Sequence, residues 1–100
     1  MPLTCPVCRA ANEQGPACRR CRADLSLLFA LESQRGAQVA VAGRALALRQ
    51  PDVAESHARA ADDLRRGADV HRLLAAAHML RRDFAAAWNE YHRARSMAGG

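Results

Sequence analysis

The chain has 100 residues, of which half are hydrophobic and a quarter charged, and its formal net charge is +5. This length suits one small domain, or a small module followed by helical hairpins, and it leaves little chain for a deep enzyme pocket. Alanine is the commonest apolar residue and only four residues are aromatic, which favours closely packed helices over a β-sandwich. No apolar stretch approaches the roughly 20 residues of a membrane span, and no signal peptide precedes the first cysteine. We therefore expect a mainly α, cytoplasmic protein that is not an enzyme, with no membrane contact and no small-molecule substrate.

The four cysteines of the chain form two Cys-x-x-Cys pairs within the first 21 residues. Each pair is a tight turn that directs two sulfur atoms toward one point, and the short loop between the pairs gives the spacing of metal ligands. Soft thiolates in a tetrahedron suit zinc, and a site filled by four sulfur atoms has no open position for a substrate. The sequence therefore predicts one structural Zn²⁺, bound by Cys5, Cys8, Cys18 and Cys21.

Three other uses of these cysteines are less well supported by the sequence. Two disulfide bonds would suit a secreted chain, and a redox-active pair would need a βαβ context that the sequence lacks. Iron takes the same four ligands in rubredoxin-like sites, so an electron-transfer protein remains a lesser alternative.

Residues 4–24 resemble the short zinc-ribbon family of small prokaryotic proteins. The matching features are Cys5-Pro6-Val7-Cys8, an Asn12-containing loop and the second cysteine pair. In that family a glycine follows each pair, whereas Arg9 and Arg22 stand at these positions here. Each arginine must then adopt either a different backbone or a left-handed one at some cost in stability. The resemblance implies an appended interaction or stabilising module, and we predict a zinc-ribbon domain over residues 1–24.

Apolar residues at helical spacing follow from residue 25 onward, and predict a helical domain over 25–98. We expect one long helix between Asp24, as its cap, and about Arg49, because Gly36 alone need not end it. Pro51 suits the first turn of a second helix, which ends near Gly67. A third helix is expected from about Asp69, as its cap, and a fourth begins after a break at 81–83. The short connections predict antiparallel hairpins. The residues expected to face inward in the last three helices are Val53, His57, Ala60, Leu64, Val70, Leu73, Leu74, Ala77, Phe84, Ala87, Trp88, Tyr91 and Ala94.

Residues 69–97 resemble a tetratricopeptide repeat, a helix-turn-helix unit that usually binds proteins. A small residue follows Leu74, and an aromatic–alanine series runs through the last helix. His78 and Arg82 stand where that family prefers an aromatic residue and a glycine. Residues 37–66 match the pattern only in a degenerate form. Two such hairpins are fewer than the three or so that a stable solenoid needs, so the ribbon, the extended first helix or a partner is expected to cover the open ends.

We therefore predict a protein–protein interaction adaptor. The residues assigned to partner binding are Ala75, His78, Arg82, Trp88 and Tyr91. For Trp88 and Tyr91 a core position is the favoured interpretation, because aromatic residues at helical spacing usually face inward.

The alternative function is a nucleic-acid-binding accessory protein, in which Arg19, Arg20 and Arg22 would contact phosphates. Acidic residues such as Asp62, Asp63 and Asp69 interrupt the other basic clusters, and the aromatic residues are not interleaved with arginines as stacking platforms. The four histidines are expected to be packed or solvated, because two of them without a nearby acid or cysteine make a poor metal site.

Overall fold

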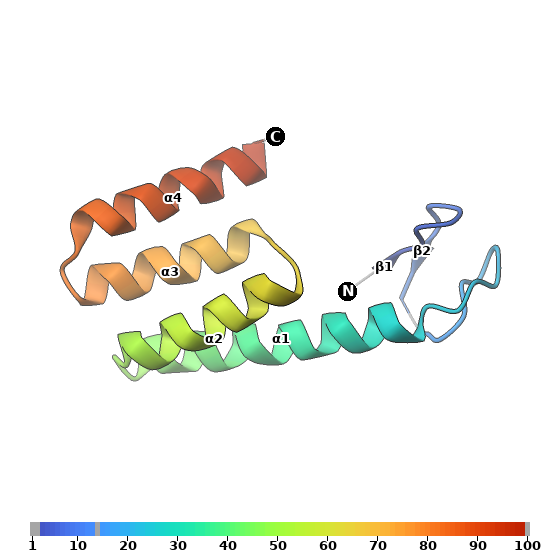
Figure 1. Cartoon of the computed structure of the whole chain (residues 1–100), viewed down its shortest axis with the longest axis horizontal. Coiled ribbons are helices and arrows are strands. Elements are labelled where there is room, and N and C mark those ends of the chain that lie inside the picture. The colour runs from blue at the N-terminus through green and yellow to red at the C-terminus, as the bar shows by residue number, and fades with distance from the viewer. Residues whose placement is uncertain (1–2, 14, 100) are drawn as a thin grey trace. The chain divides into compact units, whose positions relative to one another are not determined.

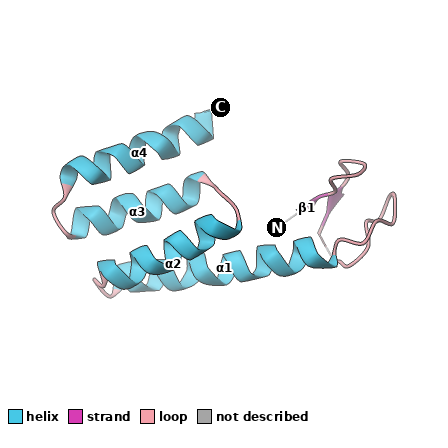
Figure 2. Cartoon of the chain, in the orientation of Figure 1, coloured by secondary structure: helices cyan, strands magenta, loops and turns pink. Residues whose placement is uncertain are grey.

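The computed structural model describes residues 3–13 and 15–99, which form two compact units divided between Ser33 and Gln34. The described elements are mainly helical, as predicted from the composition (Figures 1 and 2). In chain order they are β1 (Leu3–Thr4), β2 (Ala11–Asn12), α1 (Ser26–Ala47), α2 (Pro51–Leu64), α3 (Ala68–Leu80) and α4 (Phe84–Gly99). In the described part of the chain, no helix is both long enough and apolar enough to span a membrane.

The first unit consists of two short hairpin turns followed by the start of α1. Strands β1 and β2 are antiparallel, with Leu3 opposite Asn12 and Thr4 opposite Ala11, and they flank the first cysteine pair. A single antiparallel bridge between Ala17 and Asp24 flanks the second pair in the same way. Each cysteine pair is therefore held at the tip of its own hairpin.

The apolar core of the first unit is completed by the beginning of α1. Leu25 is fully buried against Cys5 and Cys18, and Leu28 and Phe29 pack on the same cluster. Gly15 lies so close to the Phe29 ring that an added Cβ would stand 2.8 Å from a ring carbon. A glycine is required there by this close approach.

Local signals in the sequence determine where the helices begin and end. The carboxylate of Asp24 accepts the N–H of Ser26 at 2.9 Å, and Pro51 is the first residue of α2. Helix α1 continues through Gly36, as predicted. Arg49 and Arg82, which follow α1 and α3, have left-handed backbones with φ of 57° and 62°. This conformation is common directly after helices because it satisfies the last free carbonyls.

The second unit contains an antiparallel hairpin array in which α2, α3 and α4 lie side by side (Figure 1). Its core is a seam of alanines to which α1, α2 and α3 all contribute. The buried clusters are Ala42, Ala58, Ala61, Val70 and Leu74, and Ala45, Ala54 and Ala77. Because alanine has only a methyl group, it lets helix backbones approach closely, and a small chain can build a core with few large side chains.

Buried polar contacts link the helices of this unit. The Arg35 side chain is only 5% exposed, and its guanidinium donates to both carboxylate oxygens of Asp69 at 2.9 and 2.7 Å and to the carbonyl of Arg65 at 2.8 Å. One arginine of α1 thereby binds the end of α2 and the first turn of α3. Between α3 and α4, the Nδ1 atom of His71 lies 2.6 Å from a carboxylate oxygen of Glu90, and both side chains are buried.

Several sequence-based expectations about the helices were wrong. Helix α2 buries Ala54, Ala58 and Ala61, one position away from the predicted stripe, and Val53 is exposed. Helix α3 is preceded by Gly67 as its cap, while Asp69 lies inside the first turn. The aromatic residues predicted to face inward in α4 are exposed: Phe84, Trp88 and Tyr91. The alanines beside them, Ala87 and Ala94, form the buried stripe because they allow α3 and α4 to approach more closely.

Candidate metal centre and apolar groove

The four cysteines predicted as metal ligands converge on one point in the first unit. Their sulfur atoms all lie within 4.8 Å of one another, and the Cys5–Cys21 and Cys8–Cys18 distances are both 3.6 Å. A disulfide would need about 2.05 Å, and all four cysteines are free. In a tetrahedral site with bonds of about 2.3 Å, two sulfurs are about 3.8 Å apart. The four residues can therefore hold a metal ion with little rearrangement.

The two hairpins that present these sulfurs have the same backbone hydrogen bonds. In the first, the N–H of Cys5 donates to the Ala10 carbonyl at 2.9 Å and the N–H of Arg9 to the Cys5 carbonyl at 2.8 Å. In the second, Cys18 pairs with Ala23 and Arg22 with Cys18 at 2.8 and 2.9 Å. Arg9 and Arg22 have φ of 63° and 62°. The turns therefore keep the left-handed geometry that glycine would favour, although arginine occupies both positions.

Electrostatics at the cluster favour a bound cation. The backbone N–H groups of Cys21 and Arg20 and the amide of Asn12 stabilise the Cys18 thiolate, so the pKa of Cys18 falls to about 5 despite burial. At Cys21 the N–H of Ala23 favours the thiolate, but burial and the three neighbouring sulfurs outweigh it and raise the pKa to about 12. Four thiolates so close together repel one another, and a divalent cation removes that repulsion.

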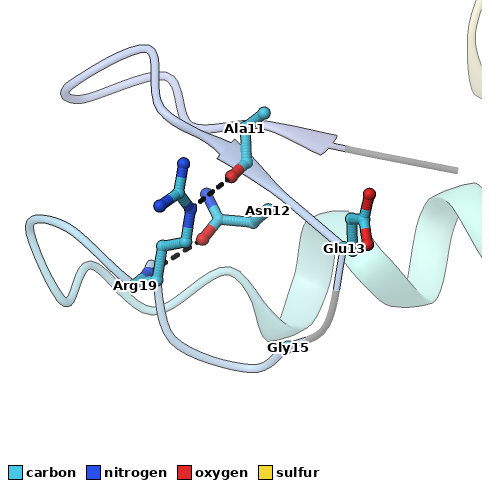
Figure 3. Close-up of a pocket in the computed structure, with 5 residues that line it drawn as sticks. All are labelled: Ala11, Asn12, Glu13, Gly15 and Arg19. Carbon is cyan, nitrogen blue, oxygen red and sulfur yellow. Dashed lines mark hydrogen bonds between the residues drawn. The ribbon is translucent and has the colours of Figure 1, made fainter.

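Asn12 lies beside the cysteine cluster and links the two hairpins that present it. Its side chain is buried, its Nδ2 donates to the Ala10 carbonyl at 3.0 Å and to the Cys18 sulfur at 3.5 Å, and its Oδ1 accepts the N–H of Arg19 at 2.8 Å. Figure 3 shows this last bond beside the one from the Arg19 side chain to the Ala11 carbonyl, at 2.8 Å. Asn12 thus ties the two hairpins together, a role that its place in the zinc-ribbon pattern could have indicated.

The same hairpins carry the arginines considered for nucleic-acid binding. Arg19, Arg20 and Arg22 are all exposed on the second hairpin. The guanidinium of Arg19 is engaged with the backbone of β2. A Cys₄ centre with a divalent ion adds a formal charge of −2, which cancels the +2 of residues 1–24.

A second candidate site is an apolar groove of about 410 Å³ between α3 and α4. We call it the α3–α4 groove, and its lining residues are Ala75, Ala76, Met79, Phe84, Ala87, Trp88 and Tyr91. Phe84, Trp88 and Met79 are 58%, 60% and 54% exposed. Large apolar side chains gathered on one open face are typical of a binding surface.

The groove includes some of the predicted partner-binding residues and not others. Ala75, Trp88 and Tyr91 line it, whereas His78 does not and Arg82 lies in the turn that joins α3 to α4. Met79 and Phe84 were missed, because Met79 was given no role and Phe84 was assigned to the core. Their spacing from Ala75 and Trp88, four residues in each case, is the signal that could have placed all of them on one stripe.

Within the described residues, the histidines do not form a second cluster of side chains that could hold a metal ion. His71 pairs with Glu90, and Nδ1 of His57 lies 2.6 Å from Oε1 of Gln38.

Comparisons of this chain with models of protein families, with curated proteins and with solved structures found no match.

Proposed function

We propose that this protein is a non-enzymatic protein–protein adaptor, in which a structural zinc ion shapes the first unit and the α3–α4 groove binds a protein partner. The observation that carries the proposal is the groove itself, where Met79, Phe84 and Trp88 are each more than half exposed. A small chain that leaves its largest side chains in water loses stability that burial would otherwise supply. Contact with a partner would recover that stability.

Zinc is the proposed ion because four thiolates in a tetrahedron form a closed structural site. Such a site has no coordination position for water or substrate, which supports a role without chemistry. Iron would occupy the same ligands, and the two metals are separated by elemental analysis and by colour, since ferric tetrathiolate sites absorb visible light and zinc sites do not.

A tetratricopeptide-like arrangement of the last hairpin is part of this proposal. The connection between α3 and α4 spans only residues 81–83, and Arg82 holds the left-handed backbone that glycine would favour. In that architecture each hairpin leaves a face on which the next helix packs, and the α3–α4 groove is such a face at the end of the array.

The proposal is tested by placing a photo-cross-linking side chain in the groove, at Met79, in the cells that make the protein. We expect an adduct with a defined protein that mass spectrometry identifies, and its loss when Ala76→Arg fills the groove. The matched control carries the cross-linker at Ser56, which is exposed on α2.

Two results would contradict the adaptor function. Equal adducts from positions 79 and 56 would show that the groove is not selective. A nuclease-sensitive complex that requires Arg20 and Arg22, with no groove-dependent adduct, would favour nucleic-acid binding instead.

A further inference from the structure

The α3–α4 groove is flanked by positive charge at both ends. Arg72 lies on α3 one turn before Ala75 and Ala76, so it is on the same face of the helix. Arg95 lies on α4 one turn after Tyr91, with its guanidinium 6.0 Å from the centre of that ring. Because α3 and α4 are antiparallel, these two arginines stand at one end of the groove. Arg82, in the connecting turn, stands at the other.

These three arginines are not neutralised within the described part of the chain, where no ion pair involves any of them. The nearest acid between the two helices, Glu90, is buried and engaged by His71 and Arg93. Asp83 accepts the N–H of Ala86 at the start of α4. Asp69 of α3 and Glu90 of α4 are thus paired within the protein, while Asp83 lies beside Arg82 in the connecting turn. The three exposed arginines outnumber this one acid, so the charge around the groove is positive.

A second copy of this chain is a poor occupant for such a groove. Residues 34–100 contain eleven arginines and seven acidic residues, and the whole chain carries +5. Self-association through the groove would bring arginine-rich rims together, and like charges at an interface oppose binding. An acidic partner would instead be attracted to the groove and oriented in it.

The shape of the groove suits a helix. A shallow trough between two antiparallel helices accepts the side chains of a third at intervals of three and four residues. The protein already uses this packing once, because Ala42 and Ala45 of α1 pack against residues of both α2 and α3. The open face of the α3–α4 hairpin offers a corresponding surface on which a further helix can pack.

We infer, on the basis of the adaptor function proposed above, that the α3–α4 groove binds an amphipathic helix whose apolar stripe is flanked by acidic residues at both ends. The stripe fills the groove beside Trp88, and the acidic ends pair with Arg72 and Arg95 on one side and with Arg82 on the other.

The test uses the full-length, zinc-loaded protein and two synthetic helical peptides of 18 residues. Both have leucines at intervals of three and four, and one has glutamates at both ends where the other has lysines. Trp88 is the only tryptophan of the chain, so its fluorescence reports directly on the groove. We expect a saturable blue shift with the glutamate peptide, binding at least tenfold tighter than that of the lysine peptide, and a preference that shrinks in high salt.

Two double variants separate local charge from net charge. Arg72→Glu with Arg95→Glu is expected to abolish or reverse the preference for the glutamate peptide. Arg44→Glu with Arg66→Glu changes the net charge equally on exposed residues outside the groove, and it is expected to alter the preference less than twofold. Urea unfolding of both double variants verifies that each is folded.

Four outcomes would overturn the inference. The first two are equal binding of both peptides and equal effects of the two double variants. The third is a blue shift of the protein alone that depends on its concentration and coincides with dimer formation. The fourth is displacement of the glutamate peptide by a single-stranded oligonucleotide that binds through Arg72 and Arg95. If neither peptide binds while the groove-dependent photo-adduct persists, the acidic helix is wrong and the adaptor function stands. If the photo-adduct is absent as well, both are wrong.

Discussion

The two units of this protein are organised around different kinds of core. In the first unit, a few apolar side chains such as Leu25 and Phe29 surround four converging sulfurs. In the second, a seam of alanines and an ion pair between the buried Arg35 and the half-exposed Asp69 hold the helices together. One unit has a core built around four thiols that can hold a cation, and the other has a core of closely packed alanines joined by a polar contact. The comparison indicates that a single short chain can contain two folding units with separate conditions for stability.

Removing the metal is expected to have the largest effect, and to act on one unit only. Metal binding to small thiolate modules supplies on the order of 10–16 kcal/mol at neutral pH, and the first unit has few other stabilising contacts. We expect a chelator, or Cys18→Ser, to remove amide protection from residues 3–25 while leaving that of α2 to α4 unchanged, as measured by hydrogen exchange. Ala17→Ser is the matched control. Loss of protection in α3 and α4 as well would show that the units are not independent.

Breaking the Arg35–Asp69 ion pair is expected to act on the second unit. Arg35→Met leaves the Asp69 carboxylate and the Arg65 carbonyl without their donors, and it should lower the free energy of unfolding by about 1–2 kcal/mol. Arg59→Met removes an exposed pair with Glu55 on one helix and should cost about 0.5 kcal/mol or less. Urea denaturation followed by circular dichroism measures both. Equal losses would mean that the Arg35–Asp69 pair contributes no more than a surface pair.

Acid should weaken the second unit through the same contact. Hydrogen bonds from Arg35 hold the pKa of Asp69 below its ordinary value of 3.8. The folded state therefore binds fewer protons than the unfolded state, so this stabilisation is present above pH 3.8 and is lost as the pH falls through the folded-state pKa. We expect the urea midpoint for α2 to α4 to fall in this range, and Asp69→Asn to make the fall shallower. Asp63→Asn, on an exposed acid, should leave the slope unchanged.

The smallest expected effect concerns the left-handed arginines. Arg82→Gly should raise the free energy of unfolding of the second unit by about 0.5–1 kcal/mol, because glycine adopts a positive φ without steric cost. Arg72→Gly, in the regular part of α3, should lower it by about 1 kcal/mol. Thermal unfolding compares the two substitutions. If both substitutions lower the free energy of unfolding, the Arg82 side chain contributes more stability than its left-handed backbone costs.

Most helix boundaries and the convergence of the four cysteines could be predicted because each depends on short-range signals. Pro51 can begin a helix but cannot continue one, and Asp24 supplies an acceptor for a free N–H group. Two pairs of cysteines in closely spaced turns have few geometrical solutions. These features depend on residues that lie close together in the sequence, so they can be predicted without knowledge of the rest of the fold.

The inward faces of the helices could not be predicted in the same way. In α4, one stripe contains Phe84, Trp88 and Tyr91, and the neighbouring stripe contains Ala87 and Ala94. Both are apolar, so hydrophobic periodicity does not decide between them, and residues of both stripes were assigned to the core. The choice depends on how closely α3 and α4 approach, which is a property of the assembled hairpin. The partnership of Arg35 with Asp69 was hidden for a related reason, since it joins residues 34 positions apart.

The fully buried alanines have a consequence for how this sequence can change over generations. Ala54, Ala58, Ala61 and Ala77 have no exposed surface, so even one extra methyl group would force helices apart at a cost of about 1–3 kcal/mol. These alanines, which the amino-acid composition alone does not distinguish from other alanines, are thus the least replaceable residues of the helical unit. Related chains should keep these methyl groups while their bulkier, solvent-facing side chains diverge.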